Sequence, residues 1–362
     1  MKLALTAGGT GGHILPALAV LDAMHDREGL VTEVRFFGPE DRGERSIVES
    51  RGIRFEAVPS AGVRGRGPIE LAQSAWELGT GVFVGVRKLQ SFNPDAVFST
   101  GGYGSFPTSV AARLLRRPLV VYLPDVTPGW AVSAEKRLAT RVATTTEEAL
   151  KHLPRKKTTV TGYPVRKAFF EMSREDARRE LGLLDGDRVI VIAGASQGAK
   201  AINDAIFAAV PQLAGVATIF HMTGASDLPR AAQIRNELPP AQTRHYQVAD
   251  FRNDLPVLMK AADLGVFRAG ASVLGELPAA GLPSVLIPGT FAGGHQRDNA
   301  RWLAEGGAAV VVEEAGMDLG ASIRGLILDD ARLAAMREAA NALAHPDAAD
   351  RIADLIVEVA RK

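Results

Sequence analysis

The sequence has 362 residues, of which 46% are hydrophobic and 23% are charged, and its formal net charge is +1. A chain of this length usually forms more than one domain, and its composition is typical of a soluble globular protein. Because the sequence contains no cysteine, disulfides, thiolate metal sites and cysteine nucleophiles are excluded. No apolar run approaches the ~20 residues of a membrane span, and the apolar N-terminus breaks into glycines too early for a signal peptide. We therefore expect a cytoplasmic protein.

The charge is unevenly distributed along the chain. Residues 1–163 contain 21 Lys and Arg against 16 Asp and Glu, whereas residues 164–362 contain 21 against 25. A basic N-terminal half favours contact with an anionic partner. A chance distribution of surface charge is the alternative.

The first half alternates short apolar runs with helical segments, which is the pattern of a doubly wound α/β fold with a parallel sheet. The runs expected to be strands cover residues 2–7, 34–37, 53–58, 95–99, 119–122, 141–143 and 158–160.

A glycine-rich loop, residues 8–12, follows the first expected strand and ends at His13. A helix is predicted from about Leu15, with Pro16 at a position that needs no N–H donor. Because an imidazolium ion would face the positive end of the helix dipole, we expect the His13 ring to stay neutral. His13 is therefore a candidate general base, and a histidine that only packs in the loop is the alternative.

A long helix is predicted over residues 69–89, and its central part, residues 78–86, is apolar. The basic residues that flank this part in the sequence are Arg64, Arg66, Arg87 and Lys88. Apolar side chains beside Lys and Arg are typical of a segment that rests on an anionic bilayer surface. The alternative is a core helix with basic ends.

A second glycine-rich loop, residues 101–105, also follows an expected strand, and Asp125 comes soon after the next one. In a parallel sheet, the loops that follow strands meet at one edge. Both glycine loops and Asp125 should therefore line one crevice. Asp125 is a second candidate base, and an ordinary turn residue is the alternative.

The segment Gly162-Tyr163-Pro164-Val165-Arg166 is expected to connect two domains, because Pro164 stiffens a linker. The plan of strand, glycine loop and helix then repeats. The strands expected in the second half cover residues 188–193, 218–221, 245–248, 264–267 and 284–287. We therefore predict a first domain over residues 1–163, a second over residues 164–345, and a tail helix over about residues 346–362 that packs back on the first domain.

Residues 262–299 combine the features expected of a nucleotide-sugar site. Gly270-Ala271-Ser272 begins a helix after a strand, and the N–H groups at such a helix start suit a phosphate. Glu276, one turn later, is placed to hold the two hydroxyls of a ribose. The remaining polar residues of this segment are Arg268, His295, Gln296 and Asn299. Because strand–glycine–helix turns occur in every doubly wound protein, a purely structural turn is the alternative.

Asp185 and Asp187 form an Asp-x-Asp pair, a pattern that can hold a divalent metal with a sugar diphosphate. The pair lies at the amino end of an expected strand, away from the crevice, so we expect an ordinary polar turn. We expect no metal, no cofactor and no nucleic acid partner.

Several motifs together resemble those of the MurG family of bacterial glycosyltransferases, over nearly the whole chain. They are GGTGGH (residues 8–13), GGYGSFP (101–107), GYPVR (162–166), GASQGAKAIN (194–203) and the segment 267–299. The resemblance implies two Rossmann-like domains that face a cleft, the GT-B fold. It also implies a peripheral protein on the inner face of the bacterial plasma membrane, which transfers N-acetylglucosamine from UDP-N-acetylglucosamine to lipid I and forms lipid II in peptidoglycan synthesis, without a metal.

The resemblance also implies roles for individual residues. The backbone near Arg252 would face uracil, Glu276 would bind the ribose, and His295, Gln296 and Asn299 would face the sugar. The donor-binding residues would be Arg166, Ser196, Arg252, Arg268, Gly270, Ala271, Ser272, Glu276, His295, Gln296 and Asn299. The acceptor-binding residues would be Thr10, Gly11, Gly12, Gly102 and Tyr103.

One segment departs from the family. Where relatives usually carry His-Glu-Gln-Asn, this chain has Tyr122-Leu123-Pro124-Asp125, on the expected acceptor side. We therefore predict an inverting UDP-sugar transferase with His13 or Asp125 as the base. The alternatives are a transferase for another lipid or a natural product, a UDP-sugar 2-epimerase, and a UDP-sugar-binding protein without catalysis.

Overall fold

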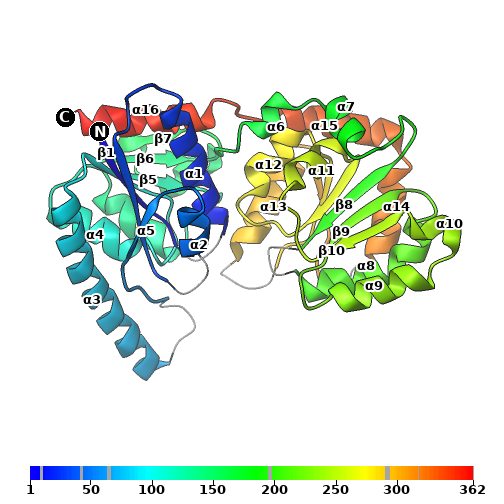
Figure 1. Ribbon diagram of the computed structural model, residues 1–362, viewed down its shortest axis with the longest axis horizontal. Coiled ribbons are helices and arrows are strands. Elements are labelled where there is room, and N and C mark those ends of the chain that lie inside the picture. The colour runs from blue at the N-terminus through cyan, green and yellow to red at the C-terminus, as the bar shows by residue number, and fades with distance from the viewer. Residues whose placement is uncertain are drawn as a thin grey trace. The chain divides into compact units, whose positions relative to one another are not determined.

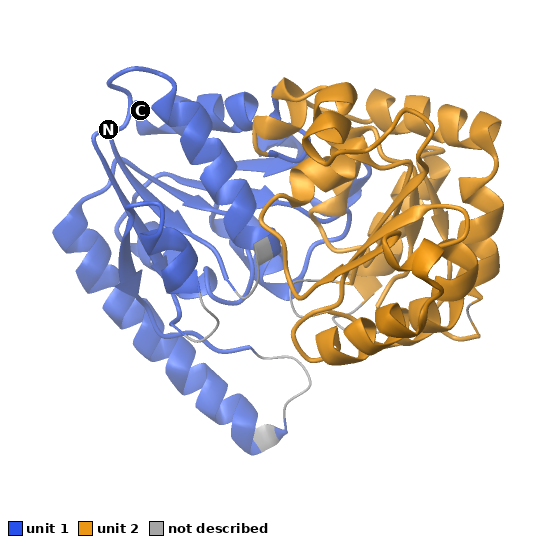
Figure 2. Ribbon diagram, turned by 45° about the vertical axis from the view of Figure 1, so that its right-hand side comes forward, with its two compact units in different colours: residues 1–165, 347–362 blue, residues 166–346 orange. Residues whose placement is uncertain are grey.

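The computed structural model describes residues 1–8, 11–40, 44–62, 67–194, 198–289, 294–316 and 318–361. The chain forms two compact units, Met1–Val165 with Asp347–Lys362, and Arg166–Pro346 (Figure 2). Each unit is built on a parallel sheet with helices beside it (Figure 1). This confirms the predicted doubly wound α/β class in both halves of the chain.

The first unit contains a seven-stranded parallel sheet in the order β3-β2-β1-β4-β5-β6-β7. Its strands are β1 (Lys2–Thr6), β2 (Glu33–Gly38), β3 (Arg54–Ala57), β4 (Ala96–Ser99), β5 (Leu119–Leu123), β6 (Arg141–Thr144) and β7 (Thr158–Val160). Every residue of β4 and β5 is buried, as expected for central strands covered on both faces. The strand order reverses between β1 and β4, and a crevice forms at such a reversal, at the carboxyl ends of the strands.

Helices cover both faces of this sheet (Figure 1). They are α1 (Gly11–His25), α2 (Glu44–Glu49), α3 (Pro68–Phe92), α4 (Phe106–Leu114), α5 (Trp130–Leu138) and α16 (Ala348–Ala360), with two 3₁₀ turns, η1 (Glu148–His152) and η2 (Arg155–Lys157). The tail helix α16 packs on α1, β4, β5 and β6, and Arg27 of the first unit pairs with Asp350 at 3.0 Å and Asp354 at 2.6 Å. The last helix of the chain is therefore part of the first unit.

The second unit contains a six-stranded parallel sheet in the order β10-β9-β8-β11-β12-β13, with its reversal between β8 and β11. Its strands are β8 (Val189–Ala193), β9 (Thr218–Met222), β10 (Tyr246–Ala249), β11 (Leu264–Phe267), β12 (Ser284–Leu286) and β13 (Ala309–Val311). Its helices are α6 (Ala168–Glu171), α7 (Arg174–Glu180), α8 (Lys200–Leu213), α9 (Leu228–Glu237), α10 (Pro240–Thr243), α11 (Leu255–Ala261), α12 (Val273–Ala280), α13 (His295–Glu305), α14 (Leu319–Ile327) and α15 (Asp330–Ala342).

The start of α1 differs from the prediction. The helix begins at Gly11 and not near Leu15, so Pro16 lies inside it and leaves the Gly12 carbonyl without the usual N–H partner from residue 16. The hydroxyl of Tyr163, a residue only 4% exposed, donates a hydrogen bond of 3.2 Å to this carbonyl. A side chain distant in sequence thus satisfies the group that Pro16 leaves open, and His13 lies in the first turn of the helix.

Candidate active site

The structure brings the two glycine loops of the first unit into backbone contact. The Gly8 N–H donates to the Gly101 carbonyl at 3.1 Å. A Cβ atom on Gly102 would lie only 2.2 Å from the Gly8 carbonyl oxygen, and the φ of Gly102 is +86°. Both the close approach and the left-handed backbone exclude a side chain at Gly102. The loops that follow β1 and β4 therefore lie against each other at the point where the strand order reverses.

His13 is anchored to the second of these strand ends. Its Nδ1 atom lies 2.9 Å from the carbonyl oxygen of Thr100, and the Thr100 hydroxyl donates to the His13 carbonyl at 2.6 Å. A carbonyl oxygen can only accept, so Nδ1 must carry a proton and Nε2 has the free lone pair in the neutral ring. The ring is partly exposed, and in this tautomer Nε2 is the nitrogen that can accept a proton.

Asp125 lies two residues beyond the end of β5 and is partly exposed. Beside it, Tyr122 is fully buried, and its hydroxyl contacts the Thr145 hydroxyl at 2.7 Å. Burial raises the pKa of Tyr122 well above 10, the hydrogen bond with Thr145 lowers it, and the Asp125 charge raises it further. The buried, hydrogen-bonded side chain of Tyr122 thus fixes the segment that replaces the family motif. The Asp125 side chain of the same segment is partly exposed.

The predicted acceptor residues fall at the two glycine loops where the structure describes them. Gly11 and Gly12 form the start of α1, Gly102 lies in the loop after β4, and the Tyr103 carbonyl accepts a 2.6 Å hydrogen bond from the Ser60 hydroxyl. Thr10, together with the predicted donor residue Ser196, lies outside the described residues.

In the second unit, three predicted donor residues come together at the start of α12. Ser272 precedes the helix, and both its hydroxyl and the charge of Arg166 act on the Glu276 carboxyl. Burial raises the pKa of Glu276, whereas Ser272 and Arg166 lower it. A carboxylate with a nearby cation at a helix start is suited to accept hydrogen bonds from sugar hydroxyls.

The turn before α12 is tight and open on one side. The N–H groups of Val273 and Leu274 bond back to the carbonyls of Gly270 and Ala271 at 3.2 and 3.1 Å. A Cβ atom on Gly270 would meet no described atom within 4 Å, so there is free space in front of this residue. A phosphate bound here would use the N–H groups of Gly270, Ala271 and Ser272.

Two other predicted donor residues, Arg268 and Gln296, make contacts within the unit. Arg268 pairs with Glu314 at 2.9 Å and donates to the Ile287 carbonyl at 3.3 Å. The Gln296 side-chain oxygen accepts the Gly289 N–H at 2.8 Å, and its amide NH₂ has no hydrogen-bond partner among the described residues.

Asn299 is fully buried, and its amide donates to the Ala269 carbonyl at 3.1 Å, so it connects α13 to the end of β11 and does not present its side chain at the surface. The Nδ1 atom of His295 is buried and has no hydrogen-bond partner in the part of the chain that the structure describes. Burial of Asn299 was not evident in the sequence, because a polar residue near a motif gives no sign of which helix face it occupies.

Arg252 lines a small hollow of about 60 Å³ at the ends of β9 and β10. It hydrogen-bonds Asp254 at 2.8 Å, and its guanidinium lies 5.7 Å from the Phe220 ring centre. Beneath the hollow, the buried His221 contacts Tyr246 at 3.0 Å and Asn203 at 3.1 Å, and burial lowers the pKa of His221 to about 3. Sequence reasoning missed this network, although Asn203 ends one of the quoted motifs.

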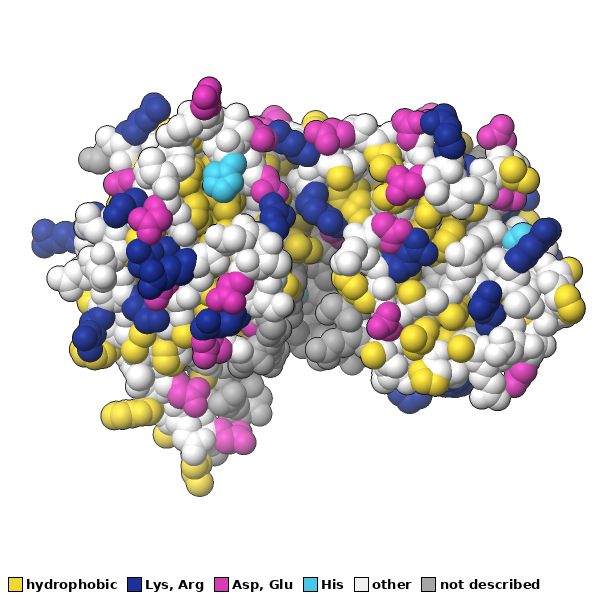
Figure 3. Space-filling model, in the orientation of Figure 1, with side chains coloured by type: hydrophobic (Ala, Val, Ile, Leu, Met, Phe, Trp, Pro, Cys, Tyr) yellow, Lys and Arg dark blue, Asp and Glu magenta, His cyan; other side chains and the backbone are white. Residues whose placement is uncertain are grey.

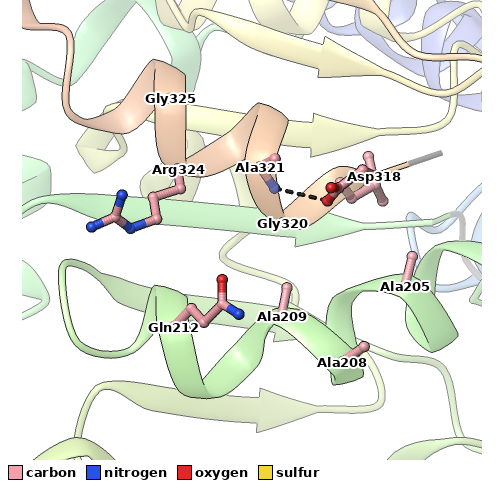
Figure 4. A pocket seen from close by; sticks show the side chains of 10 residues that line it. Ala205, Ala208, Ala209, Gln212, Asp318, Gly320, Ala321, Arg324 and Gly325 are labelled. Atoms are coloured by element: carbon pink, nitrogen blue, oxygen red, sulfur yellow. Dashed lines mark hydrogen bonds between the residues drawn. The ribbon is translucent and has the colours of Figure 1, made fainter.

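A larger hollow of about 590 Å³ lies between α8 and α14, lined mainly by small residues (Figure 4). None of the predicted site residues lines it, and its Asp318 side chain accepts the Ala321 N–H at 2.9 Å. Among the described residues, no cluster of three His, Asp or Glu side chains is arranged to hold a metal ion. Asp187 accepts the Leu184 N–H at 2.8 Å and closes a turn.

The long helix α3 has two different faces. Gly81 and Gly85 face α4, since a Cβ atom on either would lie within 3.2 Å of Pro107 or Ala111. Ile69, Trp76 and Phe83, spaced seven residues apart, are 77%, 79% and 63% exposed. Figure 3 shows apolar side chains protruding from this region of the surface.

Two of the cations predicted beside this helix make contacts within the unit. Lys88 pairs with Glu56 at 3.1 Å, and the Arg87 guanidinium lies 5.9 Å from the Phe83 ring centre. Arg64 and Arg66 lie outside the described residues. Within the described parts of the chain, no helix is both long and apolar enough to cross a membrane.

Two protein-family models match the chain in tandem. The N-terminal domain of glycosyltransferase family 28 matches residues 3–144, and its C-terminal domain matches residues 188–352. A relative from Desulforudis audaxviator, named as a UDP-N-acetylglucosamine--N-acetylmuramyl-(pentapeptide) pyrophosphoryl-undecaprenol N-acetylglucosamine transferase, is 37% identical. That alignment covers 100% of this chain and 99% of the relative.

Solved structures agree with this result. The crystal structure of Acinetobacter baumannii MurG has a TM-score of 0.77 and 27% identity, and the match covers 99% of each chain. The UDP-GlcNAc 2-epimerase from Neisseria meningitidis has a TM-score of 0.68 with 15% identity over 99% of this chain and 100% of its own, a likeness that shows the fold alone. The chain therefore belongs to glycosyltransferase family 28 and, within it, to the MurG family of N-acetylglucosaminyltransferases.

Proposed function

We propose that this protein transfers N-acetylglucosamine from UDP-N-acetylglucosamine to the lipid-linked N-acetylmuramyl-pentapeptide of lipid I, forming lipid II. The observation that carries this proposal is the 37% identity to the Desulforudis transferase over the full length of both chains. Both domains of the family are present in this chain, the N-terminal domain over residues 3–144 and the C-terminal domain over residues 188–352.

The second unit would bind the donor. The N–H groups of residues 270–272 and the positive end of α12 would hold the diphosphate, with Arg166 nearby, and Glu276 would accept hydrogen bonds from the ribose hydroxyls. The hollow beside Arg252 would take the uracil ring, and the amide NH₂ of Gln296 would donate to the sugar. These groups also stabilise the negative charge that UDP gains as it leaves.

The first unit would bind the acceptor and remove its proton. The acceptor hydroxyl oxygen forms a bond to the anomeric carbon while the bond from that carbon to UDP breaks, and attack opposite UDP inverts the configuration. The hydroxyl proton passes to Nε2 of His13, because the contact of Nδ1 with the Thr100 carbonyl leaves Nε2 as the basic atom. Asp125 is the second candidate for this role.

We further propose that the exposed side of α3 rests on the membrane that contains the acceptor. Residues seven apart lie on one helix face, so Ile69, Trp76 and Phe83 form a continuous apolar stripe, and they are among the large apolar side chains that the first unit leaves exposed. An amphipathic helix of this kind binds at the lipid interface by burying its apolar face. The protein would then be a peripheral membrane protein.

The direct test is transfer of labelled N-acetylglucosamine from UDP-N-acetylglucosamine to lipid I, with UDP-glucose as the control donor and other lipid diphosphates as control acceptors. We expect labelled lipid II, with the anomeric configuration inverted, only from the matched donor and acceptor. Formation of UDP-N-acetylmannosamine without an acceptor would instead identify a 2-epimerase, and transfer to another lipid would reassign the acceptor.

A further inference from the structure

A carboxyl group is buried directly beneath the second glycine loop. Glu135, on α5, is 0% exposed. The Ser99 hydroxyl lies 2.8 Å from its Oε2 atom, and the Ser105 hydroxyl lies 2.6 Å from its Oε1 atom. No cation among the described residues pairs with this carboxyl group. A buried carboxylate without a cation is costly, so its presence requires an explanation.

Both serines also hold the backbone of the loop. The Gly101 N–H donates to the Ser99 hydroxyl oxygen at 3.2 Å, and the Ser105 hydroxyl lies 2.8 Å from the Gly102 carbonyl oxygen. Gly101 and Gly102 have φ values of +80° and +86°, and because glycine can adopt many other conformations as easily, hydrogen bonds help to fix this one. Glu135 therefore connects through two hydroxyls to residues 101–105, the loop of the predicted acceptor side.

The number of available protons decides the state of this network. The Ser99 proton goes to Oε2, since its oxygen already accepts from Gly101. The single proton of Ser105 faces two acceptors, Oε1 of Glu135 and the Gly102 carbonyl. If Glu135 is a neutral acid, its own O–H donates to Ser105, and Ser105 donates to Gly102, so all four contacts are hydrogen bonds.

An ionised Glu135 would break this arrangement. Its carboxylate would accept the hydrogen bond of the Ser105 hydroxyl in place of the Gly102 carbonyl, because a charged acceptor forms the stronger hydrogen bond. Among the described residues, the Gly102 carbonyl would then keep only the weaker 3.3 Å bond from the Ser105 N–H. Loss of one of the contacts that hold a left-handed glycine would allow the loop to move.

The surroundings favour the neutral form. Burial raises the pKa of Glu135 to about 7, against smaller lowering effects of Ser105, Ser99 and Ser109. Ser109 acts without meeting hydrogen-bond geometry, as its hydroxyl has no partner among the described residues. The titratable and charged groups on α5 and on the elements packed against it, α4 and β5, are Lys136, Arg137, Arg113 and Tyr122, and none of them contributes to the shift.

We propose that Glu135 is a positioning residue for the acceptor side of the site, acting as a neutral acid that donates to Ser105 and thereby fixes the Gly102 carbonyl. The inference rests on the proposed function in one respect, because it takes residues 101–105 as part of the acceptor side. Acceptor binding should therefore weaken as Glu135 ionises, while donor binding in the second unit stays unchanged.

The first test measures the loop without any substrate. Glu135→Gln retains an N–H donor for Ser105 and a carbonyl for Ser99 but cannot ionise, and Glu28→Gln, an exposed acid of the same unit, is the matched control. We compare amide hydrogen exchange of residues 101–105 in the parent and the variants at pH 6 and pH 8. A group with a pKa near 7 is ~10% ionised at pH 6 and ~90% at pH 8.

The ratio of parent to Glu135→Gln exchange rates should thus be near one at pH 6 and rise several-fold, up to ~10-fold, at pH 8. Glu28→Gln should follow the parent at both pH values. A ratio that stays constant between the two pH values overturns the proposal. This result does not depend on which reaction the protein catalyses, so it is separable from a failure of the proposed function.

The second test measures transfer to lipid I across the same pH range. The KM for the acceptor should rise several-fold above pH 7 in the parent, stay low in Glu135→Gln, and be high at both pH values in Ser105→Ala. The KM for UDP-N-acetylglucosamine should not change. An acceptor KM with the parent's pH dependence in Glu135→Gln, or an unchanged acceptor KM in Ser105→Ala, contradicts the proposal.

Discussion

The hydroxyl of Tyr163 donates a hydrogen bond of 3.2 Å to the carbonyl of Gly12, across 151 positions of the sequence. It supplies the donor that Pro16 lacks and so completes the first turn of α1, which carries His13. The contact is partly buried, so water can replace it only in part when it is removed.

Tyr163→Phe should lower the free energy of unfolding by about 0.5–1.5 kcal/mol, the net contribution of a typical hydrogen bond, because the contact is only partly buried. In a Pro16→Ala background, residue 16 regains an N–H for the Gly12 carbonyl, so the same substitution should cost clearly less. Urea unfolding of the four proteins gives the coupling between the two sites. Equal costs in both backgrounds would show that the Tyr163 hydroxyl does not compensate for Pro16.

His13→Ala should lower kcat by at least ~10²-fold, because a positioned general base contributes about 10²–10⁴-fold. The affinity for UDP should stay unchanged, since the predicted donor residues lie in the other unit. Asp125→Asn should have the smaller effect. Single-turnover transfer rates measure both variants, and a reversed ranking would assign the base to Asp125.

Glu276→Ala should weaken UDP binding by about 1.5–3 kcal/mol, the range for hydrogen bonds to a charged group. Glu180→Ala, which removes an exposed carboxylate from α7 of the same unit, is the matched control and should bind UDP like the parent. Titration calorimetry measures both. Unchanged affinity in a folded Glu276→Ala protein would remove the ribose assignment.

The buried Glu135 also predicts a pH dependence of stability. Its pKa rises from 4.5 in the unfolded chain to about 7 in the folded protein, so the folded state binds more protons between these values. The free energy of unfolding therefore falls as the pH rises from 4.5 through about 7. The Glu135→Gln variant lacks the titrating group, so its free energy of unfolding does not fall in this way. Relative to the parent, this variant should gain about 2–3 kcal/mol between pH 5 and pH 8 in urea unfolding. An unchanged difference would show that Glu135 does not titrate in this range.

Replacing Trp76 and Phe83 by serine should reduce co-sedimentation with vesicles that contain anionic lipid, because two large apolar side chains no longer enter the interface. Leu184 and Leu328, which are 73% and 41% exposed in the second unit, provide the control double substitution to serine. The control should bind vesicles like the parent. Equal binding by all three proteins would exclude α3 as the contact surface.

Periodicity and glycine placement were sufficient to predict the architecture. Apolar runs such as residues 119–122 are followed by turns and helices in a regular order, and a parallel sheet covered on both faces needs such runs. The motifs around His13 and Glu276 likewise indicated the family, since they depend on residues close together in the sequence. The exact start of α1 was not predictable, because a proline normally marks the first turn of a helix.

The sequence by itself therefore determined the α/β class and the family, and it predicted the segments that contain the site. Only the tertiary structure decided the partners of individual side chains: Thr100 for His13, Glu314 for Arg268, Tyr163 for Gly12, and two serines for Glu135. Local patterns follow from backbone geometry and the burial of apolar faces, which short segments already express. Hydrogen bonds between residues tens of positions apart depend instead on how strands and helices pack, and no local pattern records that packing.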